Sequence, residues 1–233
     1  MYVNPEIKKI EGLDLNDKGY PVLNTANALL VDDYVKNKSS YSNESGGDFV
    51  RRYFSEHKGD TSLFSVITKI ILIDTVDSTN LKVHLGKDYY KIMAKRIIDA
   101  DIEPLIAKGA PLGDKFREIA ALPPKANSKK SDLNLFIFLS KYITRVNQYC
   151  YGGDAYSIMD SVVRDNLPKF SDPENGIFIP KLEPMRVEYK FDEYCEIISS
   201  ILKAHPGMTR EALDHFVWFC FKKEAVGDTS DIE

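Results

Sequence analysis

The stretch DLNLFIFLSKYITRVNQ, residues 132–148, decides the fold class of this chain. Its apolar residues recur so densely that they occupy most sides of a 3.6-residue helical turn, as in a helix buried at the centre of a larger body. Four of its polar residues fall near one stripe: Asn134, Lys141, Arg145 and Gln148. The segment therefore predicts a central helix that needs other helices around it.

The rest of the chain has the same helical periodicity. Besides 132–148, we expect helices at 25–36, 48–58, 61–77, 88–100, 112–122, from about 160, at 191–204 and at 209–223. The proline-rich stretch 168–184 predicts an extended connection, and no alternating strand pattern exceeds about five residues. We expect an all-α fold of two intimately packed helical lobes with a cleft between them. Residues 1–58 are predicted to form a helical segment packed on a domain of residues 59–227, followed by a frayed acidic tail, 228–233.

Composition excludes several classes of protein. The 233 residues are 43% hydrophobic and 28% charged, which is enough for a core without disulfide staples. Three cysteines and four scattered histidines show no metal-ligand spacing, so we expect no metal, no iron–sulphur cluster and no cofactor. The start of the chain is polar and no apolar run approaches ~20 residues, so we expect no signal peptide, no membrane association and a cytoplasmic location. Composition leaves the oligomeric state open.

The net charge of −4 hides an uneven distribution. Residues 87–148 hold twelve Lys and Arg against seven Asp and Glu, an excess of five positive charges, so the remainder carries −9. A bulk polycation that wraps nucleic acid is excluded, whereas a local basic face is not. This segment is either an ordinary solvated surface or a flank that binds phosphates.

One pair of residues indicates chemistry. Lys141 lies about halfway along the predicted buried helix, and Asp160 follows nineteen residues later, past the turn at Gly152 and Gly153. A lysine held against an apolar helix loses solvation, which lowers its pKa and frees the amine as a nucleophile. A facing carboxylate stabilises a cation that develops at a sugar carbon. Two plainer interpretations stay open: Lys141 is the solvent-facing residue of a core helix, and Asp160 is a helix N-cap.

Two runs around this pair, 138–142 and 154–161, resemble the bacterial 8-oxoguanine DNA glycosylase OGG-fold proteins, distant relatives of the helix-hairpin-helix DNA glycosylases. In that superfamily a catalytic aspartate follows a catalytic lysine by about one helix and one turn, and Lys141 and Asp160 match those positions. The run 213–218, with its Asp and Trp, is similar to the family's closing helix. The resemblance covers roughly 61–223, in patches. The family's glycine-rich hairpin is absent, because residues 135–139 contain no glycine.

The resemblance implies a glycosylase-like helical fold and DNA as the partner. It implies excision of a damaged or modified purine such as 8-oxoguanine, with or without AP lyase activity, through Lys141 and Asp160. Expected DNA contacts are Ser78, Asn80, Lys125, Lys129, Lys130 and Arg145, and Phe216 or Trp218 would stack on the extruded base. The alternative is a catalytically inactive module of this fold that binds nucleic acid or a protein. A third hypothesis is an unrelated helical protein in which the Lys/Asp spacing is coincidental.

Overall fold

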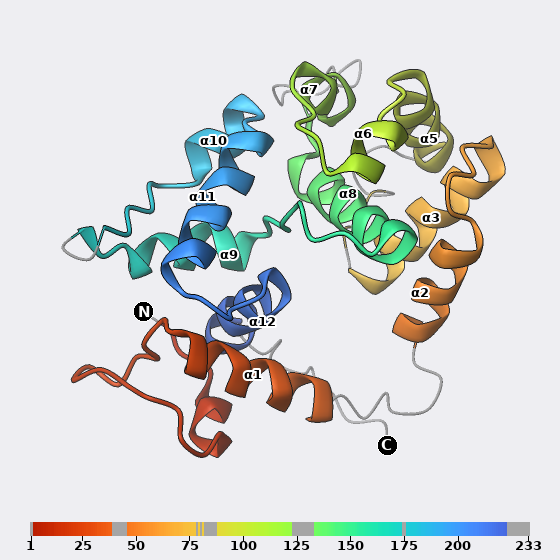
Figure 1. The fold of residues 1–233 in the computed structure, drawn as a ribbon. Helices are drawn as coiled ribbons and strands as arrows, with labels where there is room; N and C mark the ends of the chain where they lie inside the picture. The colour runs from red at the N-terminus through yellow and green to blue at the C-terminus, as the bar shows by residue number, and fades with distance from the viewer. Residues whose placement is uncertain are drawn as a thin grey trace, which may run out of the picture.

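A computed structural model describes residues 2–38, 46–77, 79, 81, 88–122, 133–173 and 176–222. Over these residues the protein is mostly helical with one very short strand pair, which confirms the predicted all-α class. Figure 1 shows the helices as two groups set side by side. Their buried apolar side chains form one contiguous core.

The first lobe surrounds the predicted central helix, α8, against which α2, α3, α6 and α7 pack, while α5 covers the outer side of α3. Its elements are α2 (Gly46–Glu56), α3 (Leu63–Val76), α5 (Tyr89–Asp99), α6 (Glu103–Lys108), α7 (Asp114–Ala120), β1 (Ala121–Leu122), β2 (Leu133–Asn134) and α8 (Phe136–Tyr151). The apolar faces that the sequence gives α8 on most sides are thus covered by several partners.

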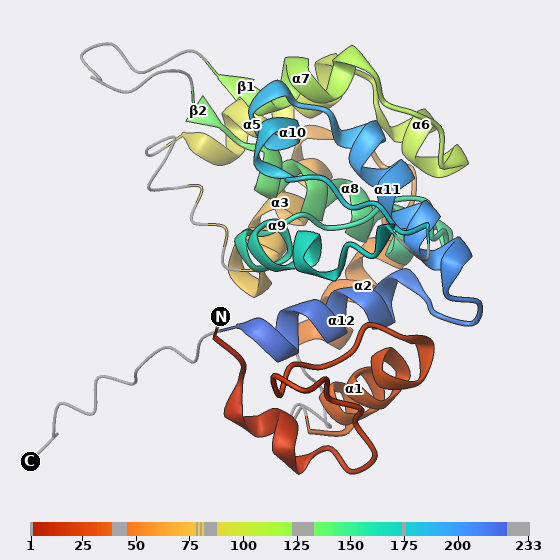
Figure 2. The same cartoon turned by 90° about the vertical axis from the view of Figure 1, so that its left-hand side faces the viewer.

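The second lobe joins the two ends of the chain. Its elements are η1 (Pro5–Lys9), α1 (Thr25–Lys38), α9 (Ser161–Asn166), η2 (Leu167–Phe170), α10 (Glu183–Glu188), α11 (Phe191–Ala204) and α12 (Arg210–Phe221). Helix α1 packs across α12 in Figures 1 and 2, and the main-chain N–H of Asn4 donates to the carbonyl of Cys220 at 2.8 Å. The two helices found within 1–58 therefore have different partners: α1 packs on α12, and α2 packs on α8.

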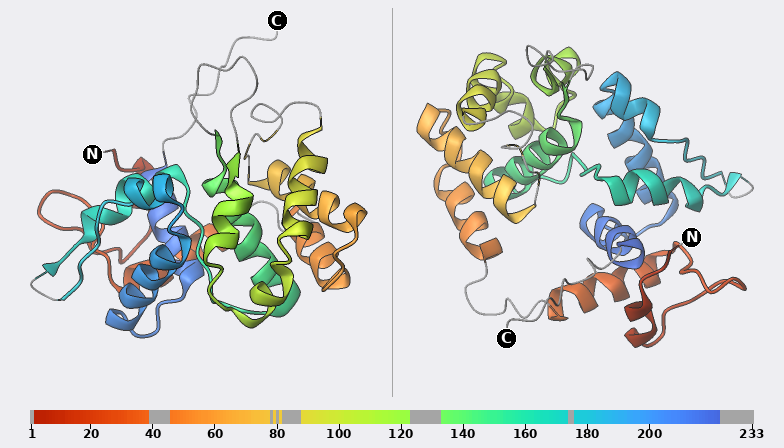
Figure 3. Two further views of the ribbon diagram at one scale, coloured as in Figure 1. Left: turned by 90° about the horizontal axis from the view of Figure 1, so that it is seen from above. Right: turned by 180° about the vertical axis from the view of Figure 1, so that it is seen from behind.

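An aromatic cluster holds the lobes together on one side. Phe116 of α7 stacks on Phe191 of α11 with ring centroids 4.5 Å apart, and Phe136 of α8 meets Phe116 edge-on at 4.8 Å. All three rings are essentially buried. The view from above in Figure 3 shows α7 and α8 running between the other helices of the first lobe and the second lobe. Because both lobes contribute to this cluster, their relative position depends on core packing.

The helix predicted at 132–148 begins four residues later than expected. Leu133 and Asn134 instead pair antiparallel with Leu122 and Ala121, and the N–H of Leu135 donates to the carbonyl of Ala120. The side chain of Asn134 then accepts a hydrogen bond from the N–H of Phe136, the first helical residue. The predicted helix at 112–122 likewise ends early, at Ala120, because the chain turns into β1. Asn134 therefore does not belong to the polar stripe of the helix.

Two short helices interrupt stretches that were predicted to be irregular. Helix α6 occupies residues between two predicted helices. Helix α10 begins at the last two residues of the proline-rich stretch 168–184 that was expected to be extended, and the 3₁₀ helix η2 occupies the first residues of that stretch. Each has a proline at its second residue, Pro104 and Pro184. A proline there costs nothing, because the N–H it lacks has no partner within the first turn.

Candidate active-site cavity

The ends of four helices enclose a cavity of about 480 Å³. The C-terminal end of α3, the first half of α8, the start of α9 and the last turn of α12 contribute, so both lobes line it. Its lining residues are Asp77, Thr79, Leu81, Asn134, Leu135, Ile137, Phe138, Lys141, Asp160, Ser161, Val162, Trp218 and Lys222. The volume falls in the range of ~300–1,000 Å³ that is usual for small-ligand sites. Lys141 and Asp160, nineteen residues apart in the sequence, therefore line one cavity.

Lys141 reaches the cavity from the second turn of α8. Its Nζ donates a hydrogen bond of 2.8 Å to the carbonyl oxygen of Asp77, which is the residue that caps the C-terminus of α3. The free carbonyls at a helix C-terminus carry partial negative charge, so a cation is favourable there. The side chain is partly exposed. Lys141 thus ties α8 to α3 and still presents an amine to the cavity.

Asp160 sits at the start of α9 and is its N-cap. The backbone there is extended (φ −102°, ψ −175°), and Oδ1 accepts a hydrogen bond of 2.8 Å from the N–H of Val163. Within the described part of the chain no hydrogen bond to Oδ2 is found. Because the cap fixes the carboxylate with one oxygen, the other is free to face a charge in the cavity. The N-cap interpretation and the catalytic one are therefore compatible at this residue.

Trp218 and Lys222 form the wall that α12 contributes. The ammonium of Lys222 lies over the Trp218 ring, 4.1 Å from its centroid, within cation–π range. Partial burial lowers the pKa of Lys222, the nearby Lys141 lowers it further, and Asp160 opposes the shift. The cavity therefore holds two amines, of which only Lys141 was predicted from the sequence. Lys222 could also have been predicted, because it lies one helical turn after Trp218 in the predicted helix 209–223.

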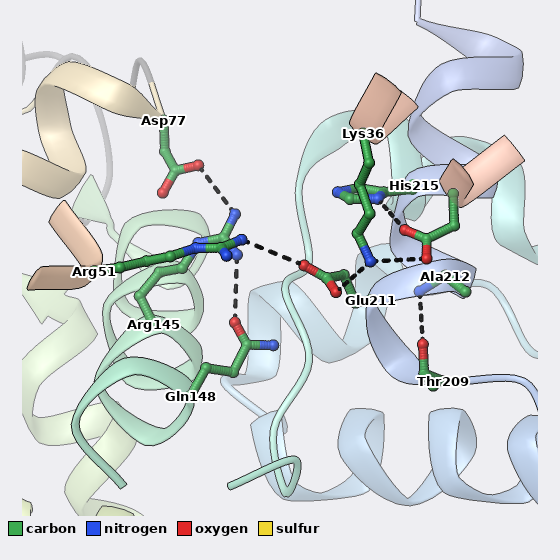
Figure 4. A network of polar contacts seen from close by, with 10 residues as sticks. Lys36, Arg51, Asp77, Arg145, Gln148, Thr209, Glu211, Ala212 and His215 are labelled. Atoms are coloured by element: carbon green, nitrogen blue, oxygen red, sulfur yellow. Dashed lines mark hydrogen bonds and ion pairs between the residues drawn. The ribbon is translucent and has the colours of Figure 1, made fainter. Parts of the chain in front are cut away.

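Arg145, expected to contact DNA, is already engaged at the junction of the lobes. Figure 4 shows its guanidinium between Asp77 and Gln148, with an ion pair of 3.6 Å to the Asp77 carboxylate and a hydrogen bond of 3.3 Å to the Gln148 side chain. It also lies over the Tyr149 ring. Since only 21% of its side chain is exposed, we assign Arg145 to positioning the end of α3.

The polar network of Figure 4 continues from the first lobe into the second. Arg51 of α2 reaches Glu211 of α12 at 3.8 Å, and Glu211 also accepts a hydrogen bond from Lys36 of α1 at 2.9 Å. Lys36 in turn donates to Asp32, which is 2.6 Å from His215 Nδ1. Three helices from distant parts of the chain, α1, α2 and α12, therefore meet through charged side chains on this side of the molecule.

Asp214 of α12 faces a separate, small cavity of about 30 Å³ between α8 and the second lobe. Burial raises its pKa to about 7, with Arg145 and Lys141 opposing the shift and Asp160 and Asp77 adding to it. Perturbed carboxylates of this kind gather at functional sites and at charged interfaces alike. Asp214 belongs to the predicted closing helix, but no role was predicted for it, because its environment depends on Arg145 and Lys141, which only the fold brings near it.

The remaining predicted site residues divide into two groups. Phe216 does not line the cavity: it is fully buried and packs on Phe170, because the helical turn directs it to the opposite side of α12 from Trp218. The proposal that Phe216 stacks on a base is therefore corrected in favour of Trp218. The other group lies outside the described residues: Ser78, Asn80, Lys125, Lys129 and Lys130.

Two further observations concern ligands and membranes. Among the described residues, no group of three or more His, Cys, Asp and Glu side chains is arranged to hold a metal ion. No helix in the described ranges combines the length and apolarity that crossing a membrane requires.

Comparison with known proteins identifies a family. A family model described as HI_0787_N, N-terminal domain, matches residues 30–149, slightly more than half of the chain, and the chain belongs to that family. The matched segment contains Lys141 and Arg145, whereas Asp160, Trp218 and Lys222 lie beyond it. No curated protein and no solved structure matches the chain. The resemblance to DNA glycosylases is not tested by these comparisons and stays a prediction.

Proposed function

We propose that this member of the HI_0787_N family is a DNA base-excision glycosylase that acts on a damaged or modified purine such as 8-oxoguanine. In this proposal the amine of Lys141 attacks the sugar C1′, and Asp160 stabilises the positive charge that builds there. The bond from C1′ to the base breaks as the bond from C1′ to Lys141 Nζ forms, which leaves a covalent sugar–protein intermediate.

The observation that carries the proposal is the shared cavity. Lys141, Asp160 and Trp218 come from α8, α9 and α12, yet all three line one space of about 480 Å³ between the lobes. A glycosylase must draw its base out of the stack and hold it against aromatic or apolar groups while the sugar carbon meets the nucleophile. Trp218 supplies an aromatic face on the α12 wall of the same space.

Borohydride trapping tests the proposal directly. The protein is incubated with duplexes that contain 8-oxoguanine, an alkylated purine or an abasic site, and borohydride reduces any imine to a stable covalent adduct. We expect an adduct with the wild-type protein and none with Lys141→Gln. Lys115→Gln is the matched control, because Lys115 also donates to a main-chain carbonyl, that of Ala100, and does not line the cavity. No adduct on any duplex, or an undiminished one with Lys141→Gln, would refute the proposal.

One contact favours a second candidate, a nucleic-acid-binding module of this fold without catalysis. Lys141 donates to the C-terminal end of α3, which is a sufficient structural role for a lysine. In that case DNA binding would weaken steeply with rising salt, because released counterions drive it, and no base would be released. Fluorescence anisotropy with the same duplexes at several salt concentrations, combined with the trapping assay, separates the two candidates.

A further inference from the structure

The cavity contains a second lysine that the proposed base-excision step does not use. Lys222 follows the last turn of α12, on the wall formed by Trp218, and Lys141 lies on the α8 wall of the same cavity. A Schiff-base chemistry that goes on to cut the DNA strand requires two groups, one to form the imine and one to remove a proton. The cavity supplies an amine for each task.

The surroundings of Lys222 suit a proton acceptor. Its Nζ is held over the Trp218 ring at 4.1 Å, and the other charged groups that line the cavity are Lys141, Asp160 and Asp77. Partial desolvation lowers the pKa of Lys222, Asp160 opposes this shift, and the positive charge of Lys141 adds to it. A larger share of neutral amine is therefore present at neutral pH than a fully solvated lysine would have.

We propose that Lys222 is the general base of a β-elimination step at an abasic site whose C1′ is bound as an imine to Lys141. Neutral Lys222 removes a proton from C2′, and the electrons of that C–H bond form a C1′–C2′ double bond as the imine becomes an enamine. The enamine then returns to the imine as its C1′–C2′ electrons form a C2′–C3′ double bond, the bond between C3′ and its oxygen breaks, and the 3′ phosphate leaves with the electrons of that C3′–O bond. Lys222 holds the proton, water hydrolyses the imine, and no oxidant or reductant is consumed.

This inference rests on the proposed function and adds strand cleavage to it. It also assigns different tasks to the two lysines, so that each can be removed separately. Arginine at position 222 would keep a cation over Trp218, but it stays protonated at any working pH and cannot accept the proton. The Lys222→Arg substitution therefore separates proton transfer from charge and packing.

The test uses the full-length protein and a duplex with a preformed abasic site. Two quantities are measured on the same samples: the adduct trapped by borohydride, and the strand cleavage that occurs without borohydride. We expect Lys222→Arg to form the adduct at the wild-type rate and to cleave at least about 100-fold more slowly, the order of a general-base contribution. Wild-type cleavage should also rise with pH more steeply than cleavage by the variant.

Lys169→Arg is the matched control. Lys169 also lies over an aromatic ring, that of Phe221 at 6.0 Å, but it does not line this cavity, so cleavage should be unchanged. A wild-type adduct without cleavage, wild-type cleavage by Lys222→Arg, or loss of both adduct and cleavage in that variant would overturn the role of Lys222 and leave the glycosylase proposal standing. Absence of any wild-type adduct would instead defeat the proposed function, and this inference with it.

Discussion

Replacing Asp214 by Asn should change how the stability of the fold depends on pH. Burial raises the pKa of the Asp214 carboxyl from its ordinary value of 3.8 to about 7, so the folded protein binds this proton more tightly than the unfolded chain. This proton therefore contributes to the free energy of unfolding at low pH. The contribution is lost as the pH rises from the pKa of the carboxyl in the unfolded chain to its pKa in the folded protein, because above pH 7 the folded state must hold a desolvated carboxylate.

The magnitude follows from the two pKa values. Between pH 5 and pH 8 the free energy of unfolding of the wild type should fall by roughly 2–3 kcal/mol through this carboxyl alone. An asparagine has almost the same size and never ionises, so Asp214→Asn should be close to the wild type in stability at pH 5. At pH 8 it should be more stable by a similar amount, because the poorly solvated charge is gone.

Urea denaturation of both proteins at pH 5, 6.5 and 8 measures this difference. Contributions from titrating groups that do not interact with Asp214 cancel between the two proteins, and equal m-values would confirm that the denatured states are comparable. Glu196→Gln, which removes an exposed carboxyl from α11, is the control for the loss of one negative charge. Parallel pH profiles for the wild type and Asp214→Asn would show that the carboxyl is normally solvated and that the reasoning is wrong.

Two further predictions concern residues that shape the cavity. Asp160→Ala should destabilise the fold by about 1 kcal/mol, because the N-cap of α9 is lost. Asp160→Asn should destabilise it much less, because asparagine is an equally good N-cap. Equal losses of stability in thermal denaturation would contradict the cap role. Asn147→Ala should cost roughly 2–5 kcal/mol in urea denaturation, because buried Asn147 donates to the carbonyl of Ile106 at 2.7 Å and accepts from the N–H of Ala155 at 3.1 Å. A loss below about 1 kcal/mol would mean that solvent replaces both bonds.

The central helix could be predicted because its signal is local and strong. Residues 136–151 carry apolar side chains on most sides, and only a helix that is covered all round accounts for that pattern. Its starting point could not be predicted, because Leu133 and Leu135 continue the apolar pattern. In the structure Leu133 and Asn134 pair with Leu122 and Ala121 instead of joining the helix. The hydrophobic periodicity of residues 132–148 gives no information about this pairing with a distant segment. Tertiary pairing overrode helical periodicity at this boundary.

The short helices α6 and α10 were not predicted, for a different reason. Each has six residues, fewer than two turns, so the pattern cannot repeat often enough to be recognised. Their prolines also favoured irregular structure, although a proline in the first turn is compatible with a helix. Helix α10 is stabilised by its packing on α11, and this contact cannot be predicted from the sequence of α10 alone.

The cavity was predictable only in part. Lys141 and Asp160 share one helix–turn–helix segment, so their spacing already suggested that they meet. Asp77 lies 64 residues before Lys141 and Lys222 lies in the last described turn of the chain, and only the fold brings them to the same place. Phe216 and Trp218 show the converse error: both are aromatic, two residues apart on one helix, and only packing against Phe170 decides which of them faces the cavity.

The hydrogen bond from Lys141 to Asp77 bears on whether this lysine can act as a nucleophile at all. An ammonium donates three N–H groups, and a neutral amine still donates two. Loss of one proton therefore does not require loss of the contact to the α3 carbonyl, although that contact is stronger for the charged form because the helix C-terminus favours a cation. The structural role of Lys141 and its proposed chemistry are thus compatible in one position.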